Sequence, residues 1–441
     1  MARRKSNAPL SVVLNGRDIG TLTKASSGAI GFRYAPTWLE EKNAIPVSLS
    51  LPLREDGYVG EPVIAVFENL LPDNKPVRES VAARFDAGGT DAFSMLSAIG
   101  RDCVGALQFL REGDARGEPG AITGDTVSDD DIAAILNNLK TAPLGMDDDA
   151  DFRISIAGAQ EKTALLWHNG KWLRPHGTTP TTHILKPRMG KVANDIDLSD
   201  SVENEYLCMK LCAAFGLPTA EVTIENFAGV KALSVTRFDR LWTRDGKLLR
   251  LPQEDFCQAL GVPPSRKYES DHGPGILKAM DLLSASDAPT QDRAQFIRAQ
   301  VLFWLLGATD GHAKNFSVFL YPNARFHMTP IYDVLSVQPT LDARQLSEKR
   351  YKLAMAVGKS RHYHVDEIVP RHFQQTARQA GFEDRVVTTM LEEIYDTATE
   401  RIASVKDALP VDVPDHLVAS IVAGVERRLN AIKLWREVAA E

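Results

Sequence analysis

Apolar and polar residues alternate in three short runs near the start of the chain, at residues 10–14, 19–22 and 30–34. The pair Asn15-Gly16 separates the first two runs. Asn-Gly between alternating apolar positions favours a tight hairpin turn, because both residues tolerate positive φ angles. A helix is predicted over residues 63–71 and ends at Pro72, because proline disfavours helical geometry in the residue before it. This part of the chain is predicted to be a small α+β unit.

The pattern then changes from strands to helices. Strand-like runs cover residues 155–166, 181–187, 220–224 and 232–237. Helical spacing over residues 198–215 stops at Gly216, as expected for a helix that ends at a glycine. After Glu254, helical stretches lie near residues 256–260, 275–284, 291–307, 364–380, 384–407 and 415–438, with one strand-like region at 317–331. This order, sheet first and helices afterwards, indicates a two-lobed α+β body with a cleft between the lobes.

Composition excludes several classes of protein. The chain has 441 residues, enough for about three domains, and its 51 Lys and Arg against 58 Asp and Glu give a net charge of −7. This charge argues against non-specific binding of nucleic acid. The longest strongly apolar run, residues 301–308, is far shorter than the ~20 residues that span a bilayer. The apolar stretch after the basic first residues is too short for a signal peptide, so we expect a cytoplasmic protein that does not enter a membrane.

Four cysteines show neither CxxC spacing nor a disulfide framework, and they are predicted to be buried thiols: Cys103, Cys208, Cys212 and Cys257. Cys208 and Cys212 lie one helical turn apart and could share a metal, but no histidine has the spacing of a partner ligand.

The densest group of polar residues is Thr309-Asp310-Gly311-His312-Ala313-Lys314-Asn315, directly after an apolar helix. Asp310 and Asn315 have the spacing of a kinase catalytic loop, in which the aspartate accepts the proton of the substrate hydroxyl and the asparagine binds a metal. Asp333 follows a predicted strand 18 residues later, where phosphotransferases place a magnesium-binding carboxylate. Spacing alone also permits a structural interpretation, with a helix cap, a loop asparagine and a strand-end aspartate.

Two further elements precede this loop. Small residues at 157–159 would let main-chain N–H groups approach phosphates, although a simple strand turn has the same composition. Lys186 is a single cation on an apolar strand, which implies an anionic partner. Glu203 and Glu205 on the next helix could include a partner for this lysine, or could both be solvated. These elements follow one another in the order found in kinases.

The same residues resemble the HipA family, the serine/threonine-kinase toxins of bacterial toxin–antitoxin pairs. The resemblance is carried by residues 154–163, 250–255, 267–269 and 307–317 and extends over nearly the whole chain. It implies an α+β, two-lobed protein-kinase-like fold related to lipid kinases. The implied divisions are an N-terminal subdomain, an acidic linker with a short helix, a small-lobe core and a helical C-terminal lobe, at residues 1–111, 112–151, 152–252 and 253–441.

By this resemblance Asp310 is the catalytic base, Asn315 and Asp333 hold Mg²⁺, and Ser155 is the site of autophosphorylation. ATP would be bound by Ala157, Gly158, Ala159, Gln160, Glu161, Lys162, Lys186, Thr236, Arg237, Phe238, His312, Lys314, Asn315, Tyr332 and Asp333. Thr236 stands where the family often has glutamate in the hinge between the lobes, which favours main-chain contacts with adenine there.

The family also implies function and partners. We expect ATP and Mg²⁺ as cofactors, a HipB-like helix-turn-helix antitoxin dimer as partner, and an aminoacyl-tRNA synthetase such as glutamyl-tRNA synthetase as substrate, with growth arrest and persistence as the outcome. Contact with operator DNA would run mainly through the antitoxin, because Gly381 replaces a basic residue of the relatives and leaves Arg378. The alternatives are a small-molecule or lipid kinase of the same fold and an inactive kinase-like co-repressor scaffold.

Overall fold

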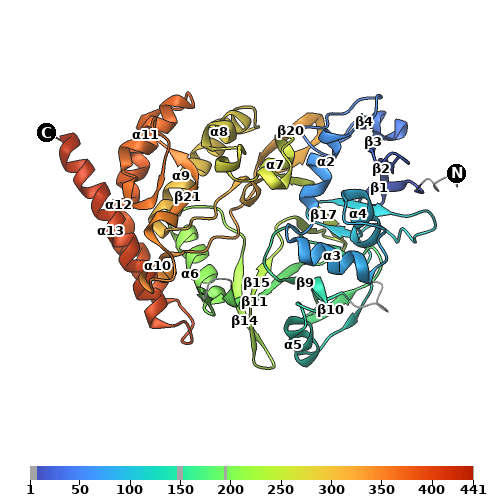
Figure 1. Cartoon of the computed structure of the whole chain (residues 1–441), viewed down its shortest axis with the longest axis horizontal. Coiled ribbons are helices and arrows are strands. Elements are labelled where there is room, and N and C mark those ends of the chain that lie inside the picture. Colours follow the sequence, from blue (N-terminus) through green and yellow to red (C-terminus); the bar gives the residue numbers. More distant parts are fainter. Residues whose placement is uncertain (1–6, 147–151, 193–195, 441) are drawn as a thin grey trace. The chain divides into compact units, whose positions relative to one another are not determined.

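A computed structural model describes residues 7–146, 152–192 and 196–440 (Figure 1). The chain forms two compact units that are interleaved along the sequence. Unit 1 consists of Met1–Pro187, Glu225–Ser265 and Ser317–Phe326, and unit 2 of Arg188–Ile224, Arg266–Phe316 and His327–Glu441. Within the described residues, no helix combines the length and the apolar character needed to cross a membrane.

Unit 1 begins with an antiparallel sheet of five strands, in the order β4 (Tyr58–Val59), β3 (Ile30–Tyr34), β2 (Arg17–Lys24), β1 (Leu10–Leu14) and β6 (Leu107–Leu110). The predicted hairpin is confirmed, since Leu14 pairs with Arg17 and both Asn15 and Gly16 have positive φ angles. The sheet is accompanied by α1 (Pro36–Leu39), α2 (Glu61–Phe67), the 3₁₀ turn η1 (Glu68–Leu70), α3 (Lys75–Arg84) and α4 (Ala92–Ile99). The helix predicted over residues 63–71 is α2 continued by η1.

A second sheet, which lies in unit 1 except for the first three residues of β14, has six strands, in the order β14 (Val222–Phe227), β15 (Val230–Thr236), β11 (His183–Pro187), β9 (Thr163–His168), β10 (Lys171–Pro175) and β7 (Gly124–Thr126). Helix α5 (Asp129–Asn137) contributes Ile132 and Leu136 to the core against this sheet. The segment expected to be a linker therefore supplies an edge strand and a core helix.

Shorter elements complete unit 1. They are β5 (Asp102–Cys103) paired in parallel with β8 (Ile154–Ser155), the hairpin of β16 (Arg240–Trp242) and β17 (Leu248–Arg250), the sheet of β18 (Gln253–Asp255), β19 (Ser317–Tyr321) and β20 (Arg325–Met328), α7 (Phe256–Ala259), and the 3₁₀ turns Pro143–Gly145 and Pro322–Ala324.

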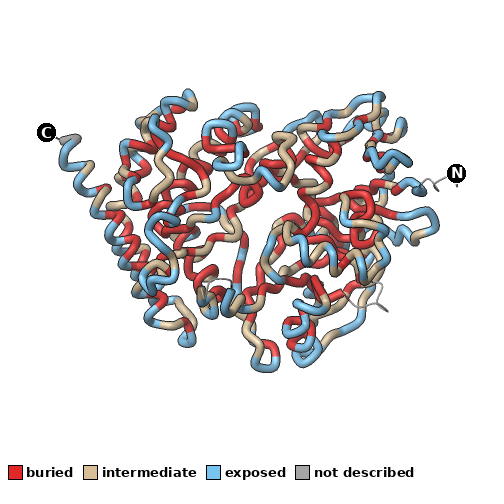
Figure 2. Tube along the Cα trace, in the orientation of Figure 1, coloured by how far each residue is buried: buried red, intermediate tan, exposed pale blue. Residues whose placement is uncertain are grey.

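Unit 2 is mainly helical. Its elements are β12 (Gly190–Val192), β13 (Ile196–Leu198), α6 (Ser201–Ala214), α8 (Ile276–Ser284), α9 (Pro289–Leu306), α10 (Gln338–Asp342), β21 (Lys352–Val357), β22 (His362–His364), α11 (Pro370–Gln379), α12 (Asp384–Asp407) and α13 (Asp415–Ala440), with short 3₁₀ turns between them. Helix α9 packs against α8, α12 and α13, and it is almost wholly buried from Phe296 onward. The long helices α12 and α13 lie side by side, and α13 alternates buried and exposed positions (Figures 1 and 2).

Thiols and surface charge agree with the expectations from composition. All four cysteines are buried thiols outside any disulfide, and burial raises the pKa of both Cys103 and Cys208 to about 12. Because they are buried and neutral, these cysteines pack as small apolar side chains.

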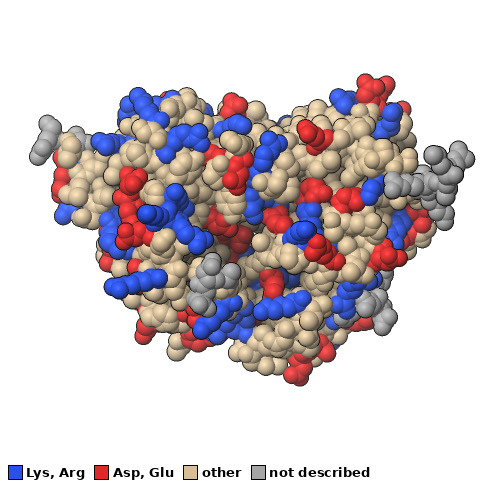
Figure 3. Space-filling view, in the orientation of Figure 1, with Lys and Arg blue, Asp and Glu red and all other residues tan. Residues whose placement is uncertain are grey.

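Acidic and basic side chains are interspersed over the face of the molecule shown in Figure 3.

Five buried charged side chains of unit 1 connect strand β5 with the segment after β15 and with the β16–β17 hairpin. Asp102 on β5 accepts hydrogen bonds from Arg240 (2.9 Å) and Arg250 (2.8 Å) at Oδ1 and from Arg237 (3.3 Å) at Oδ2. Asp239 accepts from Arg237 at both oxygens, over 3.0 and 2.8 Å. Each of these five side chains is at most 5% exposed.

Ionisation of this cluster is maintained by the arginines. Burial alone would raise the pKa of Asp102, but the fields of Arg240, Arg250 and Arg237 outweigh burial and hold this pKa well below its ordinary value. The carboxylate is therefore charged throughout the physiological pH range.

Replacing Asp102 with alanine would leave three arginines buried without their common partner. We expect Asp102→Ala to lower the free energy of unfolding by about 3–5 kcal/mol. The matched control Asp18→Ala removes an exposed ion pair with Arg116 and should change it by less than about 1 kcal/mol. Urea unfolding monitored by circular dichroism measures both, and equal effects would contradict the assigned role of the cluster.

Candidate active site

The loop with Asp310 is fixed by the end of helix α9. Gly307 ends this helix with a φ of +63°, and a Cβ atom there would lie 2.1 Å from the Tyr351 hydroxyl. Gly311 packs against Phe303, whose ring a Cβ would approach to 2.3 Å. Both positions therefore require glycine, and together they direct the chain away from the buried helix at Asp310.

Asp310 and Asp333 are brought together by Asn315. The side-chain amide nitrogen of Asn315 donates to the main-chain oxygens of Asp310 (3.0 Å) and of Asp333 (3.5 Å). The hydroxyl of Tyr332 donates to the main-chain oxygen of Lys314 over 2.9 Å, which ties the same two segments a second time. Asp333 has a left-handed φ of +61°, a strained conformation for a residue with a side chain, and such residues concentrate at functional sites.

The Asp310 side chain is exposed and held on one side. It is 67% exposed, and its Oδ1 accepts a hydrogen bond from the Tyr268 hydroxyl over 2.6 Å. This environment keeps the carboxylate accessible to a substrate hydroxyl while one of its oxygens is anchored.

The oxygen donors of this site fit magnesium. Among the described residues there is no group of three or more His, Cys, Asp or Glu side chains arranged for a metal. Mg²⁺ does not need one, because it is usually held by one or two protein oxygens together with phosphate and water oxygens. Asn315 uses its amide nitrogen for the two main-chain contacts, so its amide oxygen and the Asp333 carboxylate are the oxygen atoms that would hold the ion.

His312 is a buried, neutral imidazole. It is 4% exposed, and burial lowers its pKa below the ordinary value, an effect that Lys267 increases and the Asp310 carboxylate opposes. Its Nδ1 is buried and forms no hydrogen bond with any residue that the structure describes. A buried polar atom without a protein partner fits a group that contacts a ligand.

The segment predicted to contact phosphates lies in unit 1 and contacts the residues that follow η1. Gly158 forms a parallel bridge with Pro72 and accepts a hydrogen bond from Asp73 N (3.2 Å). Its φ is +105°, a conformation that glycine adopts readily and other residues rarely do. Lys162 donates to Ala157 O over 2.5 Å and thereby closes the loop.

Two buried lysines adjoin this loop. Lys186 lies on β11 next to Leu185, and Leu185 pairs with Thr163, the residue of β9 that directly follows Lys162. The two lysines are 6% and 7% exposed. Buried ammonium groups require anionic or carbonyl partners, and a phosphate would be one such partner.

The predicted hinge is tied to the buried charges of unit 1. Arg237 N donates to Thr182 O, and its guanidinium is bonded to Asp102 and Asp239. This side chain is therefore structural, and a nucleotide contact at this position would use the main chain. Phe238 is half-buried and meets Phe319 edge to face, with ring centroids 5.8 Å apart.

Ser155 is fully buried. Its hydroxyl donates to Leu70 O over 2.8 Å, and its strand β8 pairs in parallel with β5. A kinase cannot reach this hydroxyl until the segment leaves its place.

Helix α6 carries two glutamates, Glu203 and Glu205, and neither is solvated. This excludes the interpretation that both are solvent-exposed acids on a helix face. Glu203 is fully buried and pairs with Arg188, and Glu205 is 2% exposed. Both belong to unit 2, whereas Lys186 lies in unit 1.

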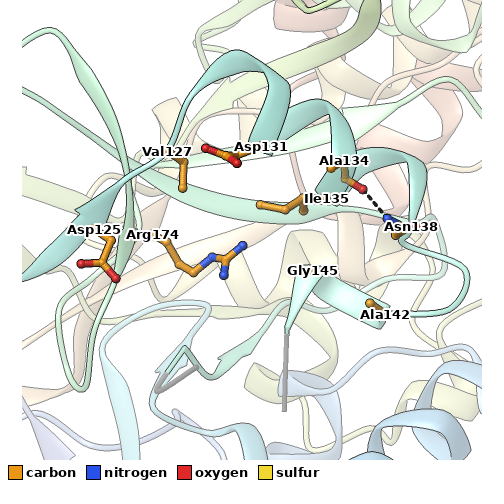
Figure 4. Close-up of a pocket in the computed structure, with 9 residues that line it drawn as sticks. All are labelled: Asp125, Val127, Asp131, Ala134, Ile135, Asn138, Ala142, Gly145 and Arg174. Carbon is orange, nitrogen blue, oxygen red and sulfur yellow. Dashed lines mark hydrogen bonds between the residues drawn. The ribbon is translucent and has the colours of Figure 1, made fainter. Parts of the chain in front are cut away.

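A cavity of about 380 Å³ lies apart from all these residues, between helix α5 and strands β7 and β10 (Figure 4). Arg174 extends into it between Asp131 and Gly145. Its lining contains no predicted site residue and consists of Asp125, Val127, Asp131, Ala134, Ile135, Asn138, Ala142, Gly145 and Arg174.

Tyr268 has no role predicted from the sequence, although Lys267-Tyr268-Glu269 is part of the resemblance to the family. The contact of Tyr268 with Asp310 joins residues 42 positions apart. A single sequence carries no spacing signal for such a contact.

Comparison with known proteins gives consistent matches along the chain. The model of the HipA-like C-terminal domain matches residues 154–402, and that of the HipA N-terminal domain matches residues 10–110. The putative kinase Y4mE of Sinorhizobium fredii is 35% identical over 96% of this chain and 98% of its own length. The serine/threonine-protein kinase toxin HipA of Shewanella oneidensis is 29% identical over 95% and 96% of the two chains.

A solved structure agrees with these matches. The complex of HipA, HipB and operator DNA from Shewanella oneidensis contains a chain that superposes with a TM-score of 0.80, at 24% identity, over 97% of this chain and 99% of that one. This likeness confirms the predicted α+β, two-lobed protein-kinase-like fold.

The geometry around His312 predicts how its pKa responds to its neighbours. An NMR titration of its imidazole proton should give a midpoint below 6.5. Asp310→Asn should lower this midpoint further, since a carboxylate favours the charged imidazole, and Lys267→Met should raise it. The folded protein binds this proton more weakly than the unfolded chain, so the contribution of His312 to stability is lost as the pH falls below about 6.5. Shifts of the same sign in both variants would contradict the geometry.

Proposed function

We propose that this chain, which belongs to the HipA family of serine/threonine-protein kinases, transfers the γ-phosphate of ATP to a protein serine as the toxin of a toxin–antitoxin pair. The observation that carries the proposal is the amide of Asn315, which joins the main chains of Asp310 and Asp333. This amide joins the segment of the proposed catalytic base to that of the second proposed metal ligand, and phosphoryl transfer needs such groups held together.

In the proposed reaction Asp310 accepts the proton of the substrate hydroxyl. As this proton leaves, the serine oxygen forms a bond to the γ-phosphorus, and the bond between this phosphorus and the bridging oxygen of ADP breaks. The products are phosphoserine and ADP. The exposed carboxylate of Asp310 suits this role, because a general base must come within hydrogen-bond reach of the incoming hydroxyl.

The other predicted residues bind and orient the nucleotide. Asn315 and Asp333 would hold Mg²⁺, which when bound neutralises charge on the phosphates. Lys186 and the loop from Ala157 to Lys162 would contact the phosphates, and the main chain from Thr236 to Phe238 would contact adenine. The remaining predicted contacts are those of His312, Lys314 and Tyr332.

The proposed substrate and partners follow the family. The substrate is an aminoacyl-tRNA synthetase such as glutamyl-tRNA synthetase, whose modification inhibits translation and arrests growth in the cytoplasm. A HipB-like helix-turn-helix dimer is the proposed antitoxin, and operator DNA is contacted mainly through it. In support, the solved relative that shares the fold is a complex with HipB and operator DNA.

Substitution of the two aspartates tests the proposed chemistry. Asp310→Asn should bind ATP normally and lose at least ~100-fold in kcat, because it removes the proton acceptor. Asp333→Ala should also lose magnesium-dependent ATP affinity. The double variant should be little worse than either single one, since both groups act on one transition state. Growth arrest and phosphorylation at the parental rate in either variant would refute the assignment.

The class of substrate is tested by locating the transferred phosphate. The protein is incubated with radiolabelled ATP and, separately, with a cell lysate, with purified glutamyl-tRNA synthetase and with a pool of metabolites and lipids. We expect label on a protein serine. Label in small molecules or lipids alone would support a metabolite or lipid kinase, and the absence of ATP turnover would support a scaffold.

Autophosphorylation at Ser155 is proposed to inactivate the kinase. The hydroxyl is buried, and a phosphate of about −1.5 to −2 charges cannot return to that site. The modified strand should stay displaced together with the phosphate loop that follows it. Transfer should therefore occur between molecules, or within one only after the segment has swung out.

The test mixes active protein with an Asp310→Asn copy of different mass and supplies ATP. We expect phosphate on Ser155 of the inactive copy and at least ~10-fold weaker ATP binding by the modified protein. Ser155→Ala is the control and should keep ATP affinity during prolonged incubation. Tight ATP binding by fully modified protein would exclude inactivation, and an unmodified inactive copy would exclude transfer between molecules.

A further inference from the structure

The loop of the proposed catalytic base, residues 310–313, is joined to residues 267–268 of unit 2. The contacts follow one another along both segments. Ala313 N donates to Lys267 O over 3.3 Å. The next pair brings the rings of Tyr268 and His312 edge to face, with centroids 4.9 Å apart at 82°. The Tyr268 hydroxyl then donates to Asp310 Oδ1 over 2.6 Å.

We propose that Tyr268 is a positioning residue, whose hydroxyl holds the Asp310 carboxylate so that Oδ2 faces the proton of the substrate hydroxyl. This inference rests on the proposed function, because it takes Asp310 to be the catalytic base. The two carboxylate oxygens then have different roles, since Oδ1 accepts the tyrosine hydroxyl and Oδ2 accepts the substrate proton.

An exposed carboxylate benefits from such a tether. The Asp310 side chain is 67% exposed, so packing restrains its two side-chain torsions little. Small errors in the direction of a base lower the rate, because proton transfer needs a hydrogen bond to the reacting hydroxyl. A phenol hydroxyl fixes the direction while leaving the carboxylate charge in place, whereas a lysine or arginine there would neutralise it.

Tyr268 is itself held firmly, which a positioning residue requires. The carboxylate of the next residue, Glu269, accepts hydrogen bonds from Ala356 N (2.7 Å) and from Arg361 (3.1 Å). The main-chain oxygen of Tyr268 accepts from Gly273 N over 2.9 Å. The hairpin of β21 and β22 thus anchors the residue that follows the tyrosine.

Close packing adds to this rigidity. A Cβ atom on Gly273 would lie 2.0 Å from Arg266 O, and one on Gly275 would lie 2.3 Å from the carboxyl carbon of Glu269. The main-chain contact therefore requires glycine at position 273, and a side chain at position 275 would displace the Glu269 carboxylate.

A purely structural role for Tyr268 predicts a different outcome from a positioning role. If the tyrosine only joins two segments, its hydroxyl contributes to the stability of the fold and has no part in the reaction. Loss of the hydroxyl should then lower the melting temperature and leave kcat unchanged. If it positions the base, loss of the hydroxyl should lower kcat and leave nucleotide binding and stability as they are.

Tyr268→Phe separates these roles, because it keeps the ring and removes only the hydroxyl. With MgATP and dephosphorylated casein or purified glutamyl-tRNA synthetase as acceptor, we expect kcat to fall about tenfold, part of the 10²–10⁴-fold contribution of a general base. ADP affinity and the melting temperature should stay at the parental values. In an Asp310→Asn background the same substitution should cause no further loss, because the carboxylate it orients is absent.

Tyr363→Phe is the matched control. It removes a tyrosine hydroxyl that accepts from Arg361 over 2.8 Å, on the anchoring side of the same network. We expect no change in kcat. Parental kcat in Tyr268→Phe, or an equal loss in both tyrosine variants, would overturn the positioning role. So would a kcat loss accompanied by a lower melting temperature. Parental activity in Asp310→Asn would instead refute the proposed function itself.

Discussion

The two carboxylates and three guanidinium groups of the cluster around Asp102 determine how strand β5, the segment after β15 and the β16–β17 hairpin fit together in unit 1. The arginines exceed the carboxylates by one charge, so carbonyl oxygens must supply further hydrogen bonds, and those engaged include the main-chain oxygens of Cys103, Gly105 and Thr178. Every one of these bonds has to be made, because an unpaired charge in this place would be strongly destabilising. The position of strand β5 and the path of the predicted hinge are therefore fixed by one network.

Local signals in the sequence were sufficient for much of the fold. The hairpin at Asn15-Gly16 and the long helices depend on neighbouring residues, and the structure has them where they were predicted. Other elements have no local signal. Strands β5 and β8 contain two residues each and pair across some fifty positions, and β7 lies in a segment whose composition resembles a linker. Two or three residues cannot show a period, so only tertiary contacts reveal them.

The site was predictable to the extent that it is compact in sequence. Asp310 and Asn315 lie on one loop, and the structure joins both to Asp333. The burial of the charged side chains at the predicted positions was not predictable from the sequence. Charged side chains are usually solvated, yet Glu203 is buried in an ion pair with Arg188, and Arg237 is buried in one with Asp102, 135 positions earlier in the sequence. Their environment follows from topology rather than from residue type.

The burial of Ser155 has a kinetic consequence. Its hydroxyl is reached only when strand β8 separates from β5 and from Leu70 O. The fraction of molecules open in this way depends exponentially on a local free energy, and about 4 kcal/mol would leave roughly one molecule in a thousand open. If autophosphorylation occurs at Ser155, its rate measures how often strand β8 separates from β5 and from Leu70 O. The lifetime of the active enzyme would then be set by how often the packing around Ser155 opens, rather than by the rate of phosphoryl transfer.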